Sequence, residues 1–408
     1  MRKRLAWGLG LPIAGLLMLG AAVLVSGCGA FGRHADGERL ARMRQSPEWR
    51  DDHFNNTQTV LKDFSGAMLR ALASVPDTEP SAPVPVHAGD AAQYATAPAD
   101  GLRVTWFGHS STLVEIDGVR VLTDPIWSER ASPVQWMGPH RWFAPPLPLE
   151  QLPAVDLVVI SHDHYDHLDR ATIVAMKQWH NVFVVPLGIG AHLEHWGIPP
   201  QRIIELDWWQ SARVGTLEVT ATPSRHASGR LKPESDTTLW SGFALRGPAH
   251  RVWYSGDTGF FAGMREIGER LGPFDLTMIE SGQYDAAWPD WHLGPEQALA
   301  AHRLVRGKVM LPVHWGLFKL APHGWTEPGE RALAAADCAG VRLLLPQPGL
   351  AVQPLSAHAA EPRRWWPQAR WLSAAQTPVV ATVAGDAAVR MPPSTCLAAA
   401  GTSSAAAD

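Results

Sequence analysis

The chain has 408 residues and a formal net charge of -4 at pH 7; 46% of its residues are hydrophobic and 18% are charged. This composition is typical of a globular protein, and the length allows one large domain or two ordinary domains with full hydrophobic cores. The mildly acidic balance argues against a nucleic-acid partner.

The N-terminus carries the pattern of a secretory signal segment. Residues 2–4 are basic, residues 5–26 form an uncharged apolar run, and small residues precede Cys28. The pattern predicts that residues 1–27 form a signal segment with a bacterial lipobox and that Cys28 becomes the lipidated first residue. The apolar run is also long enough to remain as an uncleaved membrane anchor. Either alternative predicts a protein of the cell envelope, held at the membrane surface and facing the periplasm or the exterior.

Composition divides the rest of the chain into three parts. Residues 28–100 predict a helical segment followed by a Pro- and Ala-rich linker. Residues 101–354 are expected to form the main domain, and residues 355–408 a low-complexity tail that is largely disordered. Cys338 and Cys396 lie far apart in the sequence, so no disulfide framework is predicted.

The main domain begins with strand-forming sequence. Residues 112–116 and 119–123 are rich in β-forming residues and flank an Asp-Gly pair, which is a strong signal for a hairpin. The hairpin ends at Asp124. An Asp at a strand end near a histidine cluster is a candidate to orient a ligand imidazole, although an ordinary turn Asp is an equal alternative.

A histidine-rich loop follows the next strand. Residues 155–160 are apolar and predict a buried strand, and residues 170–179 predict a helix. The loop between them therefore lies at the carboxyl end of a strand, where open α/β sheets bind ligands. It contains the order His-x-His-x-Asp-His, formed by His162, His164, Asp166 and His167.

The spacing of these residues indicates a catalytic metal site. His162 and His164 point the same way on an extended backbone and can share one cation, whereas Asp166 and His167 can face a second position. Imidazole suits zinc, manganese and iron, and a carboxylate adds charge, so the mixture fits a hydrolytic first-row metal. Structural zinc usually recruits cysteine, which this loop lacks.

The later sequence alternates between strand and helix patterns. Early hairpins followed by this alternation predict an α/β fold with two packed sheets and helices outside. The expected strands are residues 183–185, 217–221, 239–245, 252–254, 276–279 and 309–312, and the expected helices are residues 190–196, 260–271, 295–305 and 328–338.

Three of these later segments place a potential ligand after an apolar strand: His226, Asp257 and His314. Each signal is weak alone, but together with the loop they complete a set of seven ligands. Seven ligands suit two metal ions with three protein ligands each and one bridging carboxylate. Glycines flank Asp257 and would let the backbone approach a metal closely.

The ligand order resembles that of the metallo-β-lactamase superfamily, whose fold is an αββα sandwich of two mixed β-sheets flanked by helices. Within it the sequence looks most like the N-acylphosphatidylethanolamine-hydrolysing phospholipase D group and its bacterial relatives, over roughly residues 101–345. The segments that carry this likeness are residues 104–109, 122–125, 130–133, 137–139, 164–169, 205–209, 256–259 and 313–316.

The resemblance implies a role for each candidate ligand. It assigns one metal to His162, His164 and His226, the other to Asp166, His167 and His314, and the bridge to Asp257. Asp166 also counts as catalytic, and His109 and Asp124 would support the ligands from outside. The two divalent ions would be zinc by family likeness, with manganese, as in the nearby ascorbate-6-phosphate lactonase group, or iron as alternatives.

His292 matches a family histidine near the scissile group, so it could protonate the leaving group or stabilise an oxyanion; a plain loop histidine is the alternative. Trp291 stands where the phospholipase group has a polar residue, and residues 280–284 also depart from its pattern. These departures concern the substrate site, while the metal ligands are unaffected.

The expected function is a dinuclear metal-dependent hydrolase, of phospholipase D type, acting on N-acylphosphatidylethanolamine-like or related lipid phosphodiesters beside the membrane. The alternatives are a lactonase or ester hydrolase of the ascorbate-6-phosphate lactonase type and a non-enzymatic metal-binding envelope lipoprotein. Trp127, Trp136 and Trp142 fall in one Pro-rich stretch and could face lipid, although core packing is the commoner role of tryptophan.

Overall fold

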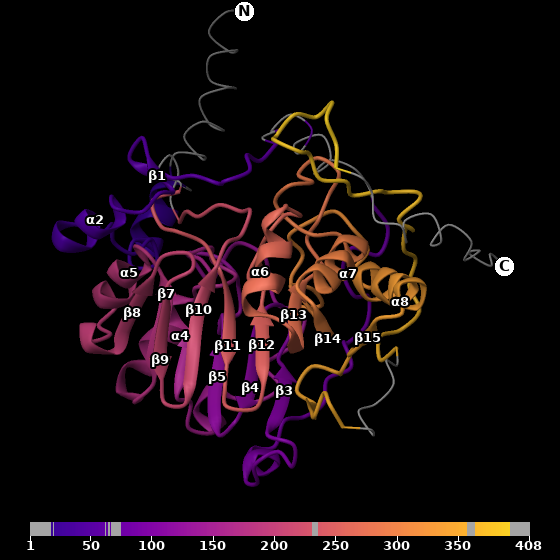
Figure 1. The fold of residues 1–408 in the computed structure, drawn as a ribbon, viewed down its shortest axis with the longest axis horizontal. Coiled ribbons are helices and arrows are strands. Elements are labelled where there is room, and N and C mark those ends of the chain that lie inside the picture. Colours follow the sequence, from indigo (N-terminus) through magenta and orange to yellow (C-terminus); the bar gives the residue numbers. More distant parts are fainter. Residues whose placement is uncertain are drawn as a thin grey trace, which may run out of the picture.

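The computed structural model describes residues 18, 20–61, 63, 66, 75–230, 236–356 and 364–391. Two seven-stranded sheets pack against each other, and helices cover their outer faces (Figure 1). This arrangement is the αββα sandwich expected from the sequence, so the predicted fold class is confirmed.

The first sheet has the strand order β16-β3-β4-β5-β6-β7-β8. Its first four strands pair antiparallel and the β5–β8 pairs are parallel, so the sheet is mixed. The strands are β3 (Leu102–Trp106), β4 (Thr112–Ile116), β5 (Val119–Thr123), β6 (Leu157–Val159), β7 (Val182–Pro186), β8 (Ile203–Leu206) and β16 (Ala351–Val352).

The predicted hairpin is β4–β5. Its two turn residues, Asp117 and Gly118, have φ angles of 49° and 86°. Positive φ at both central positions is the conformation that two-residue hairpins require, and Asp-Gly provides it at little cost. The hairpin prediction is therefore confirmed.

The second sheet has the strand order β15-β14-β13-β12-β11-β10-β9. It is also mixed, because the β9–β12 pairs are antiparallel and the β12–β15 pairs are parallel. The strands are β9 (Ser211–Val214), β10 (Leu217–Thr222), β11 (Gly242–Arg246), β12 (Arg251–Tyr254), β13 (Phe274–Glu280), β14 (Gly307–Val313) and β15 (Arg342–Leu343).

Five helices cover the sandwich: α4 (Arg170–Ala175), α5 (Ile189–His195), α6 (Gly263–Leu271), α7 (Pro295–Leu304) and α8 (Glu327–Ala339). Helices α4 and α5 share an apolar cluster with the first sheet, whereas α6, α7 and α8 share one with the second. The smaller elements are α2 (Gly37–Met43), β1 (Trp49–Arg50), β2 (His53–Phe54) and the 3-10 turns η1 (Ala91–Tyr94), η2 (Leu149–Gln151), η3 (Met176–Gln178) and η4 (Pro200–Arg202).

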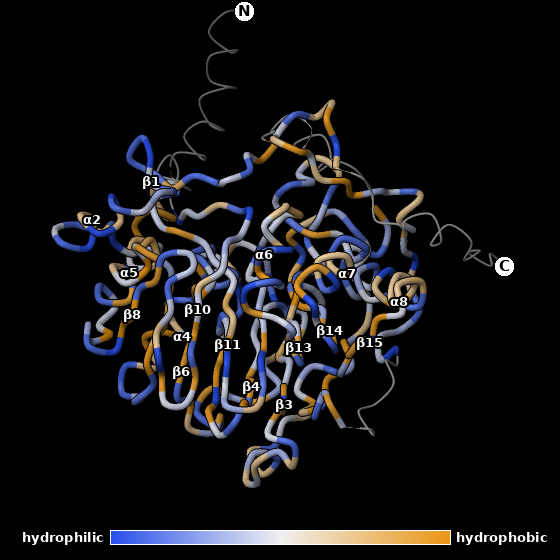
Figure 2. Tube along the Cα trace, in the orientation of Figure 1, coloured by the Kyte–Doolittle hydropathy of each residue, from blue (hydrophilic) through white to orange (hydrophobic). Residues whose placement is uncertain are grey.

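The central strands are buried on both faces. In the β4–β5 pair, Leu113 and Leu122 contact the helix side, whereas their neighbours Val114 and Val121 lie in the core between the sheets. All four are at most 1% exposed. Figure 2 accordingly shows apolar segments concentrated in the strands and polar segments in the turns that connect them. The sandwich is thus held by burial on two sides of each sheet, which fixes where the strand ends lie.

Part of the predicted C-terminal tail lies against the domain. Residues 364–391 were predicted to be disordered, but they lie on the domain, where Trp366 is 5% exposed and packs against Trp315. The Ala- and Pro-rich composition concealed this, because two adjacent tryptophans supply the apolar area that anchors the segment. The rest of the predicted tail, residues 357–363 and 392–408, and most of the signal segment, residues 1–17, lie outside the described residues.

The cysteines differ from the expectation in one respect. Cys338 in α8 is disulfide-bonded, whereas the sequence analysis predicted no disulfide. Sequence distance is a poor guide here, because any two cysteines can be brought together by the fold. Cys28 is free and exposed. Among the described residues, we find no helix with the length and apolar character needed to cross a membrane.

Candidate metal centre

The predicted ligands converge from both sheets on one edge of the sandwich. Each comes from a loop that directly follows a strand: β6 leads to the His162–His167 loop, β10 to His226, β12 to Asp257 and β14 to His314. Because these strands end at the same edge, ligands more than 150 positions apart in sequence become neighbours.

The first ligand group consists of His162, His164 and His226. The Nε2 atom of His162 lies 2.9 Å from Nδ1 of His164, which lies 3.4 Å from Nε2 of His226. Nitrogen ligands about 2.1 Å from one zinc ion in a tetrahedron lie roughly 3.4 Å apart. The three nitrogens therefore have the spacing that one metal ion requires.

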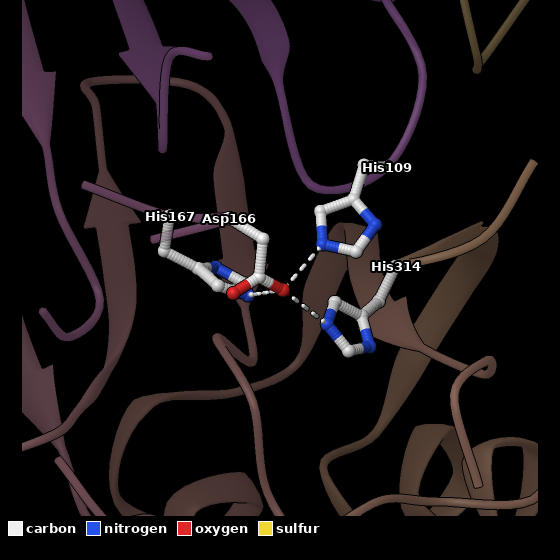
Figure 3. Close-up of side chains that lie close together, drawn as sticks. All are labelled: His109, Asp166, His167 and His314. Carbon is white, nitrogen blue, oxygen red and sulfur yellow. Dashed lines mark hydrogen bonds and ion pairs between the residues drawn. The ribbon is translucent and has the colours of Figure 1, made fainter. Parts of the chain in front are cut away.

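The second group consists of Asp166, His167 and His314, joined by His109 (Figure 3). The Oδ2 atom of Asp166 lies 3.3 Å from Nε2 of His167 and 3.4 Å from Nε2 of His314. It lies 2.9 Å from Nε2 of His109, which is fully buried. His109 was expected to support the ligands from outside, and this contact lets it do so by donating to Asp166; the same position would also let it bind a metal.

Asp257 lies between the two groups. Its Oδ2 atom is 3.1 Å from Nε2 of both His167 and His314, and it is 3.7 Å from Nε2 of His226 and 3.8 Å from Nε2 of His162. A single carboxylate oxygen thus faces imidazoles of both groups. This is the position that a carboxylate bridging two metal ions would occupy.

The outer nitrogens of the ligand histidines are held by the protein. Nδ1 of His162 contacts the Ser161 hydroxyl at 2.9 Å, and Nδ1 of His226 donates to the carbonyl of Trp291 at 2.9 Å. Nδ1 of His167 donates to Asp124 at 2.6 Å. Such contacts fix the ring orientation and leave Nε2 facing the centre, as metal-binding histidines require.

Asp124 collects these contacts beneath the site. Its side chain is fully buried and accepts hydrogen bonds from the backbone and hydroxyl of Ser161, at 2.7 and 2.5 Å, as well as from His167. The hydroxyl of Tyr254 also donates to it. Asp124 therefore has the contacts of a residue that orients a ligand, whereas an ordinary turn Asp would be solvated.

The backbone is strained at three of these positions. His109, Asp124 and His314 have φ angles of 52°, 33° and 66°. Residues other than glycine rarely adopt this left-handed conformation, and such residues cluster at functional sites. Gly256 also has a positive φ, and a β-carbon there would lie 2.7 Å from Cβ of Ser161. A glycine before Asp257 thus lets its loop approach the histidine loop.

The charges of the site favour a bound cation. Burial lowers the pKa values of His162 and His226 well below the usual value, so these imidazoles are neutral, the form that binds metals. Burial also opposes protonation of His167, but Asp257 and Asp166 raise its pKa well above the usual value. The second group therefore carries negative charge that protons or divalent cations must balance.

The residues present fit a metal. Within the described part of the chain, Oδ1 of Asp257 is a buried polar atom without a hydrogen-bond partner, and Nε2 of His167 has ion-pair contacts to Asp166 and Asp257 but no hydrogen bond. Leaving such atoms unpaired costs free energy, and a cation between them would remove that cost. The donor set of imidazoles and carboxylates suits zinc, manganese or iron.

His292 lies beside the two groups, and it also has ligand spacing to Asp257, Glu280 and His314. Its ring stacks on His314 with centroids 4.9 Å apart and lies 5.1 Å from His226. It also lines a cavity of about 290 Å³ together with His164, Asp166, Asp257 and His314. The structure therefore places His292 in the wall of the cavity beside the ligand groups. An ordinary loop histidine, the alternative, need not lie there.

Sequence reasoning missed several residues that the structure places here. Asn56 holds the loop of His226, donating to its carbonyl at 2.7 Å and accepting from its amide at 3.0 Å. Glu280, which was noticed only as a departure from the family pattern, contacts His292 at 2.8 Å. The position of Glu280 at the end of β13, in line with the other strand-end ligands, was the signal available.

Comparison with known proteins identifies the family of this chain. The family described as the beta-lactamase superfamily domain matches residues 119–315. An uncharacterised protein of Mycobacterium tuberculosis is 46% identical over 337 residues, covering 79% of this chain and 88% of that protein. The N-acyl-phosphatidylethanolamine-hydrolyzing phospholipase D 1 of Caenorhabditis elegans is 38% identical over 288 residues, covering 67% of this chain and 78% of that protein.

A solved structure shows the same fold. A possible metal-dependent hydrolase from Veillonella parvula superimposes with a TM-score of 0.50 and 16% identity, covering 61% of this chain and 98% of that one. The chain belongs to the metallo-β-lactamase superfamily and is one of its metal-dependent hydrolases. Within the superfamily, its relatives include the N-acylphosphatidylethanolamine-hydrolysing phospholipases D.

Proposed function

We propose that the protein is a phosphodiesterase of the phospholipase D type that uses two divalent metal ions, with zinc first among the candidates, to hydrolyse N-acylphosphatidylethanolamine-like or related lipid phosphodiesters. The observation that carries the proposal is that Asp257 Oδ2 faces both ligand groups at the edge of the cavity. The similarity to the Caenorhabditis elegans phospholipase supports the same class of substrate.

The walls of the cavity favour a substrate with apolar groups. Trp288, Trp291 and Leu320 line it, together with Gln283 and residues of the ligand groups. Among the described residues that line it there is no Lys or Arg. The charge of a phosphodiester would be balanced by the metal ions alone, while the apolar side chains would contact the lipid part.

The lactonase alternative fits this cavity less well. A lactone of the ascorbate-6-phosphate type carries a phosphomonoester apart from the reacting carbonyl, and such a dianion is normally bound by arginine or lysine. The cavity lining offers neither. We therefore favour a phosphodiester over a phosphorylated lactone as the substrate. We also favour hydrolysis over a purely metal-binding role.

The chain's own residues then have distinct tasks. The two ligand groups and Asp257 would hold the ions, which supply Lewis-acid charge to activate water and to neutralise the phosphoryl oxygens. Nδ1 of His292 is occupied by Glu280, so Nε2 is the atom available to donate a proton to the leaving oxygen. Trp288 and Trp291 would exclude water from the apolar side of the cavity.

A substrate panel tests the proposal. The full-length protein in detergent, loaded with Zn²⁺, should hydrolyse N-acylphosphatidylethanolamine and an aryl phosphodiester. It should act on a phosphomonoester and on a phosphorylated lactone slower by at least about 10², since the cavity has no partner for the additional charge. If the lactone is the fastest substrate, the phosphodiesterase proposal is wrong. A truncated chain starting near residue 76 is unsuitable, because it lacks Asn56, which holds His226.

We also propose that the protein is a lipid-anchored envelope protein with Cys28 as the modified residue. Cys28 is exposed, and the disulfide of Cys338 is typical of an oxidising compartment. Trp136 and Met137 are 49% and 40% exposed. Trp127 and Trp142 instead pack on Phe107 and Trp325, so of the three tryptophans only Trp136 keeps the lipid-facing role.

Cys28→Ala should prevent lipidation. We expect the variant to lose incorporation of a labelled fatty acid in bacterial cells and to leave the detergent phase on fractionation, whereas Gly29→Ala, which keeps the thiol, should behave as wild type. If Cys28→Ala is processed and fractionates as wild type does, the uncleaved anchor is the better explanation.

A further inference from the structure

We propose that Glu280 is a positioning residue that holds His292 with Nδ1 protonated and Nε2 directed to the substrate. The inference rests on the proposed function of His292 as proton donor and assigns a task to a residue at which this chain departs from the phospholipase pattern. Glu280 would act through His292, without touching the substrate itself.

The geometry of Glu280 is that of a buried orienting carboxylate. It ends strand β13, and its side chain is 0% exposed. Its Oε2 atom lies 2.8 Å from Nδ1 of His292, while Oε1 accepts the backbone N–H of Thr258. The second contact fixes the carboxylate against the Asp257 loop, so its orientation is set independently of His292.

The same oxygen also faces a metal-ligand candidate. Nδ1 of His314 lies 3.3 Å from Oε2 of Glu280, and the rings of His292 and His314 stack at an interplanar angle of 18°. One carboxylate thus faces the Nδ1 side of both rings. The Nε2 atom of His314 faces Asp166 and Asp257, whereas Nδ1 of His292 faces Glu280 and lies 3.8 Å from Oδ2 of Asp257.

The cost of burying Glu280 argues that it has a function. In the described part of the chain, its ion-pair partners are His292 and His314, and no Lys or Arg is within ion-pair distance. A buried carboxylate without a permanent cation is expensive. By contrast, the buried Glu115 pairs with Arg103 and Arg120, as a structural carboxylate does.

The contact has a defined chemical consequence. A carboxylate at Nδ1 accepts a hydrogen bond only from a protonated nitrogen, so it selects the forms of the ring in which Nδ1 carries a proton. Nε2 can then carry the proton that is given to the leaving oxygen and receive one back from water afterwards. A carboxylate that orients a catalytic histidine in serine hydrolases works in this way.

The test is Glu280→Gln, which keeps the size of the side chain and an oxygen for the Thr258 amide. Its amide group would face Nδ1 of His292 as a donor, so the ring should switch to the Nε2–H form. In ¹⁵N NMR of the Zn²⁺-loaded protein, with His292→Gln to assign the signal, we expect protonated Nδ1 in the wild type and unprotonated Nδ1 in the variant. Glu115→Gln should leave this signal unchanged.

Kinetics provide the second readout. Because Glu280 also contacts His314, the variant is assayed at saturating Zn²⁺. Under these conditions Glu280→Gln should lower kcat on an alkyl phosphodiester by about 10²–10⁴, with a much smaller loss on an activated aryl phosphodiester. An unprotonated Nδ1 in the wild type, or a variant with unchanged tautomer and rate, overturns the inference. If the wild type hydrolyses no phosphodiester while the NMR result holds, the proposed function fails and the positioning role of Glu280 stands.

Discussion

Asp257→Ala is expected to remove metal from both ligand groups and to abolish hydrolysis. The Oδ2 atom of Asp257 lies within 3.1 Å of His167 and His314 and within 3.8 Å of His162 and His226. Its loss would take a ligand from each ion at once and would remove the single negative charge that the two ions share. Because the loss of an outer-shell partner alone costs 10- to 100-fold in metal affinity, we expect a loss of more than about 10² here.

Metal analysis after dialysis checks this result. The wild type should retain close to two equivalents, as proposed for a shared site, and Asp257→Ala less than one. Asp275→Ala is the matched control, because Asp275 is also a buried aspartate, near the start of β13, but it binds Lys308 and the amide of Arg251, away from the ligands. The control should lose stability, by about 1–3 kcal/mol, and keep its metal. Wild-type metal content and rate in Asp257→Ala would contradict the shared site.

Much of the site could be predicted from the sequence because its ligands follow strands that end at one edge of the sandwich. The loop with His162 and His164 stands out by its spacing, and Asp257 and His314 each follow an apolar run that becomes a strand. In the two packed sheets β12 and β14 are parallel on either side of β13, and their carboxyl ends lie at the same edge as that of β6. The same reasoning predicts the two-layer fold, because its strands are buried on both faces and form continuous apolar sequence.

Other parts of the site depend on contacts that sequence does not encode locally. Asn56 lies in a polar segment 170 positions before His226, and only the fold brings them together. Likewise, Asp290 receives the amides of Leu61 and Thr382, at 2.8 and 2.7 Å, tying both terminal segments beside the site. Asn56 and Asp290 belong to no periodic pattern or motif in the sequence. The linker and the tail were therefore not expected to contribute to the site.

The role of His292 can be tested by measuring how strongly the rate lost in His292→Ala depends on the leaving group of the substrate. His292→Ala should retain its metal, because His292 lies outside the two ligand groups, and should lower the rate by about 10²–10⁴, the usual size of a general acid–base contribution. The loss should be larger for alkyl phosphodiesters than for activated aryl phosphodiesters, since an aryl oxide departs without a proton. His250→Ala is the control, because His250 contacts Asp117 at the β4–β5 turn.

Each of the other possible results would assign a different role to His292. His292 stacks on His314 and contacts Glu280, so its loss could also disturb the neighbouring ligand. Damage of that kind would slow alkyl and aryl substrates equally and lower the metal content. An equal loss with unchanged metal would instead indicate that His292 stabilises charge on the phosphoryl oxygens. Unchanged rates on both substrates would contradict any catalytic role, because a histidine that donates the proton cannot be removed without slowing the departure of a poor leaving group.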